Sequence, residues 1–113
     1  MYQFVELSLF TKRWKELELI DRDLRELQNA IMQTPNSAVD LGAGLHKIRQ
    51  GIAGQGKRGG IRVIYADHRK YGFIFLLVCF SKNDIENITS EQQRQLTIAS
   101  QVLMEMLLNR RKR

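Results

Sequence analysis

The feature that most constrains the fold is the apolar run GFIFLLVCF, residues 72–80. It has about half of the ~20 residues that a membrane-spanning helix needs. Apolar residues that continue without alternation are typical of a strand buried on both faces of a sheet. We therefore expect residues 71–80 to form a central strand of a soluble protein, with other elements covering both sides.

Three other segments have the composition of strands. Residues 2–7 (YQFVEL) and 60–67 (GIRVIYAD) alternate and are rich in strand formers, whereas residues 45–50 (LHKIRQ) give a weaker signal. The sequence predicts a turn at residues 67–70 and a loop at residues 36–44.

Helices are predicted before and after this group of strands. Ser8 is a candidate N-cap for a first helix, a break is expected near Ile20–Asp21, and Pro35 is expected to end a second helix. Apolar side chains recur at helical spacing in both: Phe10, Trp14 and Leu17 in the first, and Leu24, Leu27, Ala30 and Ile31 in the second. These two helices would form a hairpin that carries five of the twelve acidic residues, Glu16, Glu18, Asp21, Asp23 and Glu26.

The last helix is predicted from a capping box, in which Thr89 is followed three residues later by Gln92. Its expected apolar face is Leu96, Ala99, Leu103 and Met106, and Met104 and Met106 are interpreted as core residues. The predicted order is β-α-α-β-β-β-α. This is an α+β fold, a small antiparallel sheet packed against a helical hairpin and a C-terminal helix, in a single domain over residues 1–113.

Positive charge is concentrated in one part of the chain, whose formal net charge is +6. Residues 41–66 contain no aspartate or glutamate, and they hold Lys47, Arg49, Lys57, Arg58 and Arg62. A surface that serves only solubility usually mixes charges of both signs, and a solvated basic loop is the alternative here. We interpret the segment as a site for an anionic partner, with Lys47 and Arg49 on one face of their strand.

The glycine-rich stretch at residues 51–59 fits two phosphate-binding patterns, G-x-x-x-x-G-K and G-x-G-x-x-G. Both patterns require a helix directly after the loop. The residues that follow here, IRVIYAD, are a poor helix start, and Arg58 replaces the hydroxyl that would bind Mg²⁺. We therefore expect a β-hairpin whose loop lets a polyanion approach closely.

Conventional catalytic groups are scarce. The sequence has no metal-binding motif, Cys79 is expected to be a buried hydrophobe, His68 a surface residue, and His46 to face away from Lys47. Lysine and arginine can instead stabilise the charge that develops when the 2′-OH of RNA attacks the adjacent phosphate. A lysine acting as the base would need a lowered pKa, which Lys57, Arg62 and Lys82 could bring about in one another.

Several of these residues together carry a family resemblance. LHKIR, GQGKRGGIRVIY and the apolar strand ending in SKND resemble the HigB branch of the RelE/ParE superfamily of bacterial toxins. The resemblance covers residues 45–84, and the order of elements extends it over the chain. It implies a RelE-like fold and the toxin of a type II toxin–antitoxin pair, a ribosome-dependent endoribonuclease that cuts messenger RNA in the ribosomal A site.

The resemblance also implies roles and partners. Lys57, Arg62 and Lys82 would be catalytic, and Lys47, Arg49, Arg58 and Phe80 would bind RNA. The enzyme would need no metal or other cofactor and would act in the cytoplasm, away from membranes. Its partners would be the ribosome, messenger RNA and an antitoxin with a helix-turn-helix domain. The alternatives are a ParE-like inhibitor of DNA gyrase and an RNA-binding relative without activity.

Overall fold

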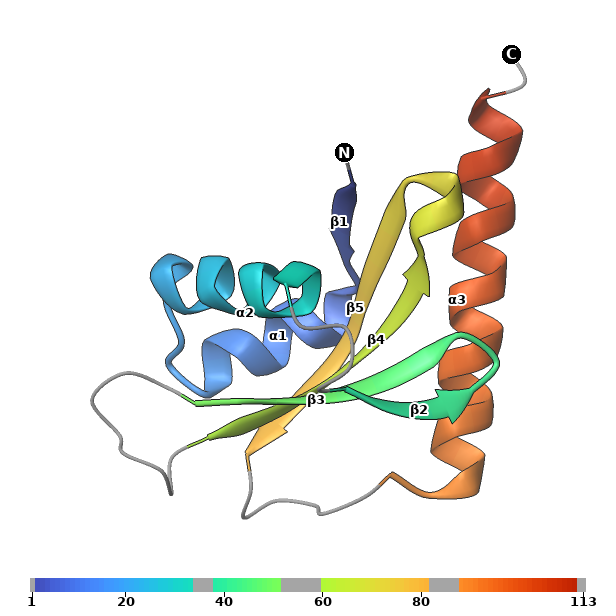
Figure 1. Cartoon of the computed structure of the whole chain (residues 1–113). Coiled ribbons are helices and arrows are strands. Elements are labelled where there is room, and N and C mark those ends of the chain that lie inside the picture. Colours follow the sequence, from blue (N-terminus) through green and yellow to red (C-terminus); the bar gives the residue numbers. More distant parts are fainter. Residues whose placement is uncertain (1, 34–37, 52–59, 82–87, 112–113) are drawn as a thin grey trace.

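The computed structural model describes residues 2–33, 38–51, 60–81 and 88–111. Its centre is a five-stranded sheet in the order β1-β5-β4-β3-β2. Helices α1 and α2 lie on one face and α3 lies on the other (Figure 1). The elements are β1 (Gln3–Glu6), α1 (Ser8–Glu16), α2 (Asp21–Gln33), β2 (Val39–Gly42), β3 (Leu45–Gln50), β4 (Ile61–His68), a 3-10 turn (Arg69–Tyr71), β5 (Phe73–Ser81) and α3 (Ser90–Arg111). The predicted α+β class is confirmed.

Strand β5 has the central place predicted from its composition. It pairs with β4 on one side and with β1 on the other, and most of its side chains are buried. Two details differ from the prediction. The β1–β5 pair is parallel, so the sheet is mixed. Residues expected to form a loop also contain the edge strand β2, which pairs with β3.

The sheet separates two hydrophobic clusters. One lies under α1 and α2 and includes Phe10, Trp14, Leu27 and Ile31. The other lies under α3 and includes Met104. The helical hairpin and its break are thus confirmed, whereas Pro35 lies outside the described residues.

An irregularity in the β4–β5 pairing changes which residues of β5 face each cluster. The register shifts between Ile64 and Tyr65, because Ile64 pairs with Val78 and Tyr65 pairs with Leu76. Leu77 is therefore the extra residue of a β-bulge. Leu76 and Cys79 belong to the cluster under α1 and α2, whereas Leu77 and Phe80 belong to the cluster under α3.

The two ends of α1 and the start of α2 are stabilised by hydrogen bonds other than the expected Ser8 cap. The N-cap of α1 is Leu7 and not Ser8, and no side chain caps this helix. At the other end, the amide of Leu19 donates to the carbonyl of Trp14 (3.1 Å), with Glu18 at a φ of 57°. This is a Schellman motif with glutamate in the place where glycine is usual. Asp23 is buried and accepts a hydrogen bond from the amide of Ile20 (3.0 Å), before α2.

Helix α3 starts at the predicted capping box. The amide of Gln92 donates to the hydroxyl of Thr89 (3.1 Å), and the amide of Thr89 donates to Oε1 of Gln92 (2.9 Å). The predicted apolar face needs one correction: Met104 is buried, but Met106 is 51% exposed. The buried face of α3 contains Ser100 and Met104, which are four residues apart. Met106 is two residues further along and so points away from the sheet. Across the described ranges, no helix is both long and apolar enough to cross a membrane.

Candidate nucleic-acid interface

Three cationic side chains meet on the α3 face of the sheet. Lys47 and Arg49 are two residues apart on β3, and Arg49 lies directly opposite Arg62 on β4. Together with Val39 of the neighbouring edge strand they line a hollow of about 270 Å³. We call Lys47, Arg49 and Arg62 the cation cluster. Lys47 and Arg49 therefore share a face, and the structure brings Arg62 to them.

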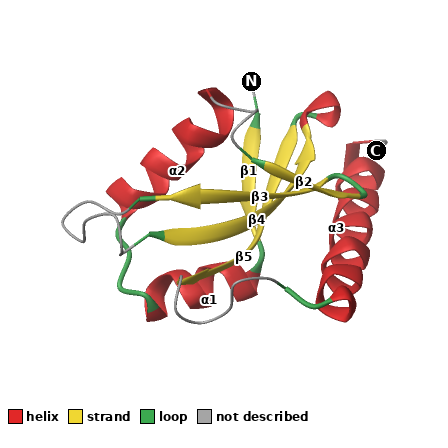
Figure 2. Ribbon diagram, turned by 60° about the horizontal axis from the view of Figure 1, so that its bottom comes forward, coloured by secondary structure: helices red, strands yellow, loops and turns green. Residues whose placement is uncertain are grey.

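The cation cluster lies at the end of the sheet that α3 leaves uncovered. Figure 2 shows α3 beside the opposite end of β3 and β4, near the turn that follows β4. Cationic side chains here keep access to solvent: Arg49 is exposed, and Lys47 and Arg62 are half-buried. A ligand as large as a polynucleotide can therefore reach them.

The two ends of the glycine-rich stretch lie next to each other at this end of the sheet. Gln50 pairs with Ile61, and a Cβ atom on Gly60 would come within 3.2 Å of the Gln50 carbonyl oxygen. The residues that follow form β4 and not a helix. The stretch therefore connects a β-hairpin, as predicted, and lacks the helix start that nucleotide-binding loops require. Lys57, Arg58 and Lys82 lie outside the described residues.

Two like charges lie opposite each other in the cation cluster. Arg49 and Arg62 face each other across an antiparallel pair, where Cα atoms are about 5 Å apart. Like charges in this position destabilise a sheet. Residues 41–66 provide no carboxylate to neutralise them. A bound anion, and above all a run of phosphates, would relieve this repulsion.

Phe80 sits beside the cation cluster, as the partner of Arg62 across β4 and β5. Its side chain is 4% exposed and belongs to the hydrophobic cluster under α3. The ring therefore packs in the core next to Arg62, and only a small part of it can contact a ligand.

The two histidines lie apart from the cation cluster. His46 stacks on Tyr65 at 5.3 Å between ring centroids, on the α1–α2 side of the sheet, as predicted from its position in the strand. Burial raises the pKa of Tyr65. Because His46 and Tyr65 lie on the α1–α2 side of the sheet, neither side chain can reach a phosphate bound over Arg62 on the α3 side.

His68, expected to be a surface residue in a turn, is half-buried. It ends β4, and its Nε2 lies 2.8 Å from the hydroxyl of Ser100, which is itself buried in α3. Its ring also contacts Phe75 at 5.1 Å between centroids. Burial lowers the pKa of His68, although the nearby carboxylate of Asp67 acts in the opposite direction. No local sequence pattern indicates this contact, because Ser100 is far away along the chain.

Cys79 is buried, as expected. Burial raises its pKa to about 12, and its Sγ contacts the carbonyl oxygen of Phe10 at 3.8 Å. A thiol in this state is a poor nucleophile. Within the described parts of the chain, no group of three histidine, cysteine, aspartate or glutamate side chains is placed to hold a metal ion.

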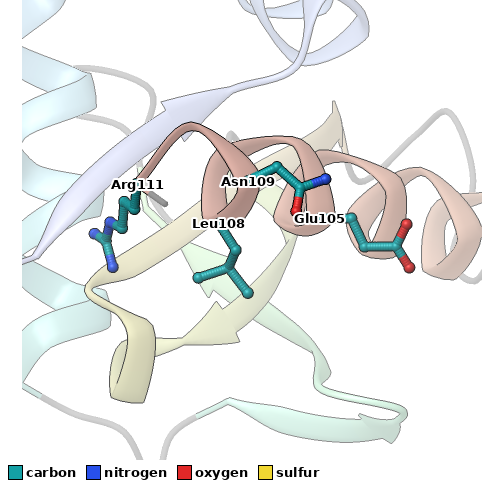
Figure 3. A pocket seen from close by; sticks show the side chains of 4 residues that line it. All are labelled: Glu105, Leu108, Asn109 and Arg111. Carbon is teal, nitrogen blue, oxygen red and sulfur yellow. The ribbon is translucent and has the colours of Figure 1, made fainter. Parts of the chain in front are cut away.

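A larger hollow, of about 550 Å³, lies at the other end of the sheet along the C-terminal half of α3 (Figure 3). It is lined by Glu105, Leu108, Asn109 and Arg111. Arg111 has a structural contact here, since its guanidinium lies 4.5 Å from the ring centre of Phe73 and donates to the carbonyl of Tyr71 (2.8 Å). The carboxylate of Glu105 makes this hollow a poorer anion site than the cation cluster.

Comparison with known proteins places the chain in a family. A solved structure of an arginine-to-alanine double mutant of E. coli toxin RelE, in the free state, superposes with a TM-score of 0.51. The identity is 14%, over 75% of this chain and 87% of that one, which shows a shared fold. The family described as "RelE toxin of RelE / RelB toxin-antitoxin system" matches residues 5–110. Because this match includes nearly all of the sequence, the chain belongs to the RelE toxin family.

Proposed function

We propose that this protein is the toxin of a type II toxin–antitoxin pair and that it cuts messenger RNA in the ribosomal A site. The observation that carries the proposal is the cation cluster at the uncovered end of the sheet, in a chain of the RelE toxin family. A HigB-like subtype is part of the proposal and is supported by the motifs around residues 45–84. The antitoxin partner would carry a helix-turn-helix domain.

The proposed reaction uses the RNA's own nucleophile. The 2′-oxygen forms a bond to the adjacent phosphorus, the bond from phosphorus to the 5′-oxygen breaks, and the products carry a 2′,3′-cyclic phosphate and a 5′-hydroxyl. One proton leaves the 2′-OH and another reaches the departing 5′-oxygen. Arg62 and Lys57 would stabilise the negative charge that develops on the phosphate. Lys82 would act as the acid or as a further stabilising charge.

The remaining cations have a binding role in this proposal. Lys47, Arg49 and Arg58 would hold the RNA backbone on either side of the reacting phosphate. Arginine offers a planar fork that matches two phosphate oxygens, whereas lysine offers a compact charge. No metal or other cofactor is part of the proposed reaction.

The test is cleavage of a defined transcript by purified protein and ribosomes, followed by primer extension. We expect Arg62→Ala to lower the cleavage rate by roughly 10²-fold, the typical effect of removing one charge-stabilising donor. Lys82→Ala and Arg49→Ala should also lower it. Arg25→Ala is the matched control, because Arg25 is an exposed arginine of α2 on the other face of the sheet.

Two outcomes would overturn the proposal. One is a rate that Arg62→Ala and Lys82→Ala leave unchanged. The other is wild-type protein that leaves transcripts intact and blocks DNA supercoiling by gyrase, as the ParE-like alternative requires.

A further inference from the structure

A second hollow lies on the strand next to Arg62 of the cation cluster. It has a volume of about 320 Å³ and lies at the end of β5, between α1 and the start of α3. Its walls are mainly apolar and come from all three elements and from Ile88, two residues before α3: Leu9, Val78, Cys79, Phe80, Ile88 and Leu96. We call it the apolar pocket.

The pairing of β4 with β5 connects this pocket to the cation cluster. Phe80 lines the pocket, and its partner across the strands is Arg62. Neighbouring strands are ~4.8 Å apart, so the pocket on β5 lies about 10 Å from the cations on β3. A polynucleotide whose phosphates contact Arg49 and Arg62 would therefore have a base within reach of the pocket.

Polar groups at the rim suit a neutral ligand with a hydrogen-bonding edge. The rim carries the guanidinium of Arg13 and the side-chain amides of Gln92 and Gln95, and no described lining residue has a carboxylate. Oxygen Oε1 of Gln92 already accepts from the Thr89 amide, and Nε2 of Gln95 lies 3.3 Å from the Glu91 carboxylate. These contacts direct the remaining Nε2 donor of Gln92 and the remaining Oε1 acceptor of Gln95 to other partners.

We propose that the apolar pocket binds one nucleobase of the RNA whose backbone lies on the cation cluster. The apolar walls would take the faces of the base, and Gln92, Gln95 and Arg13 would bind its polar edge. One donor and one acceptor side by side are the groups that reading a base edge requires. This inference rests on the proposed function and deepens it, because the pocket would set the base preference of cleavage.

The first test is the codon profile of cleavage on ribosomes, measured for variants that fill or alter the pocket. Leu9 is 48% exposed, so Leu9→Trp can fill the pocket without displacing a core residue. Gln95→Ala removes a rim group from an exposed position. Because binding one base is worth about 1–3 kcal/mol, each variant should change the ratio between the most and least cleaved codons by about tenfold.

The matched controls are Ile98→Trp and Gln101→Ala. Both residues are on α3 and exposed, and neither lines the pocket. They should leave the codon profile unchanged. Circular dichroism would reveal a variant that changes the codon profile only because it unfolds. The codon profile of the other, folded pocket variant would then test the proposal.

The second test does not depend on cleavage. Nucleoside monophosphates are titrated into the ¹⁵N-labelled protein, with ribose 5-phosphate as the control that carries phosphate but no base. We expect the side-chain amide signals of Gln92 and Gln95 to shift with a nucleotide and not with ribose 5-phosphate, and Leu9→Trp should abolish the shift.

The outcomes separate this inference from the proposed function. Wild-type cleavage with a codon profile that Leu9→Trp and Gln95→Ala do not alter would overturn the base pocket and leave the endoribonuclease standing. A pocket that responds to an apolar peptide and not to nucleotides would also overturn it. Wild-type protein that cuts no transcript on ribosomes would remove the proposed function and the inference together.

Discussion

At the scale of single residues, His68 shows how a buried contact creates a pH dependence. Its ring lies between Phe75 and Ser100, and burial lowers its pKa from the ordinary value of 6.5. In the unfolded chain the ring binds a proton near that ordinary value, whereas in the folded protein it stays neutral to lower pH. The unfolded state therefore binds more protons between these two values, and stability falls as pH decreases through this window.

We predict that the free energy of unfolding decreases as pH falls below about 6.5 and that His68→Gln reduces this decrease. Glutamine does not titrate and can still bond to the Ser100 hydroxyl. Urea unfolding of both proteins at several values between pH 8 and pH 5 would measure the difference. Parallel curves for the two proteins would contradict the assignment to His68.

At the scale of secondary-structure elements, the turn between α1 and α2 contains a local conflict. Glu18 has a φ of 57°, in the left-handed region, and its amide donates to the carbonyl of Lys15 (3.0 Å). Residues other than glycine pay roughly 1–2 kcal/mol for this conformation. The Schellman motif around Leu19 and the packing of both helices hold it in place.

We therefore predict that Glu18→Gly raises the free energy of unfolding by about 0.5–1 kcal/mol, after the larger entropy of glycine in the unfolded chain is allowed for. The matched control is Lys12→Gly, which places glycine at an exposed position within α1 and should lower stability by about 1 kcal/mol. Thermal or urea unfolding measures both. Equal effects of the same sign would show that the turn is not strained.

The elements also differ in how far the sequence could predict them. β5 and the start of α3 were predictable because each signal is local: an apolar run in one case and the Thr89–Gln92 pair in the other. β2 was not, because Val39–Gly42 is short and exposed, with an Asp40 side chain that bonds to the Gly42 amide (2.8 Å) as in a turn. The shared face of Lys47 and Arg49 followed from strand periodicity, whereas the register that places Arg62 opposite Arg49 did not. The apolar pocket depends on three elements distant in sequence.

At the scale of the whole molecule, positive charge is concentrated on one face of the sheet. Residues 8–33, which include both helices of one face, contain five acidic and five basic residues and are balanced, whereas the other face carries the cation cluster. Such a difference orients a molecule as it approaches a polyanion, because the face with the cation cluster is attracted more strongly. It also makes binding sensitive to salt.

We predict that ribosome binding weakens with salt and that the double change Arg49→Glu, Arg62→Glu lowers the slope of log affinity against log salt by about 1–2, as expected for the loss of two phosphate contacts. The double change Arg22→Glu, Arg25→Glu alters net charge equally, on the exposed side of α2. It should change the slope much less. Identical slopes for the two variants would mean that net charge, and not the cation cluster, governs binding.

The β-bulge at Leu77 has a consequence for how this chain tolerates change in length. If the same residues paired with β4 without a bulge, Phe80 would exchange sides with Cys79, and a thiol would replace the ring beside Arg62. Deleting Leu77 would instead give a regular ladder in which Val78, Cys79 and Phe80 keep their present sides. The bulge therefore makes this strand tolerant of losing one residue at that point, whereas an added residue would need a second bulge to keep Phe80 beside Arg62.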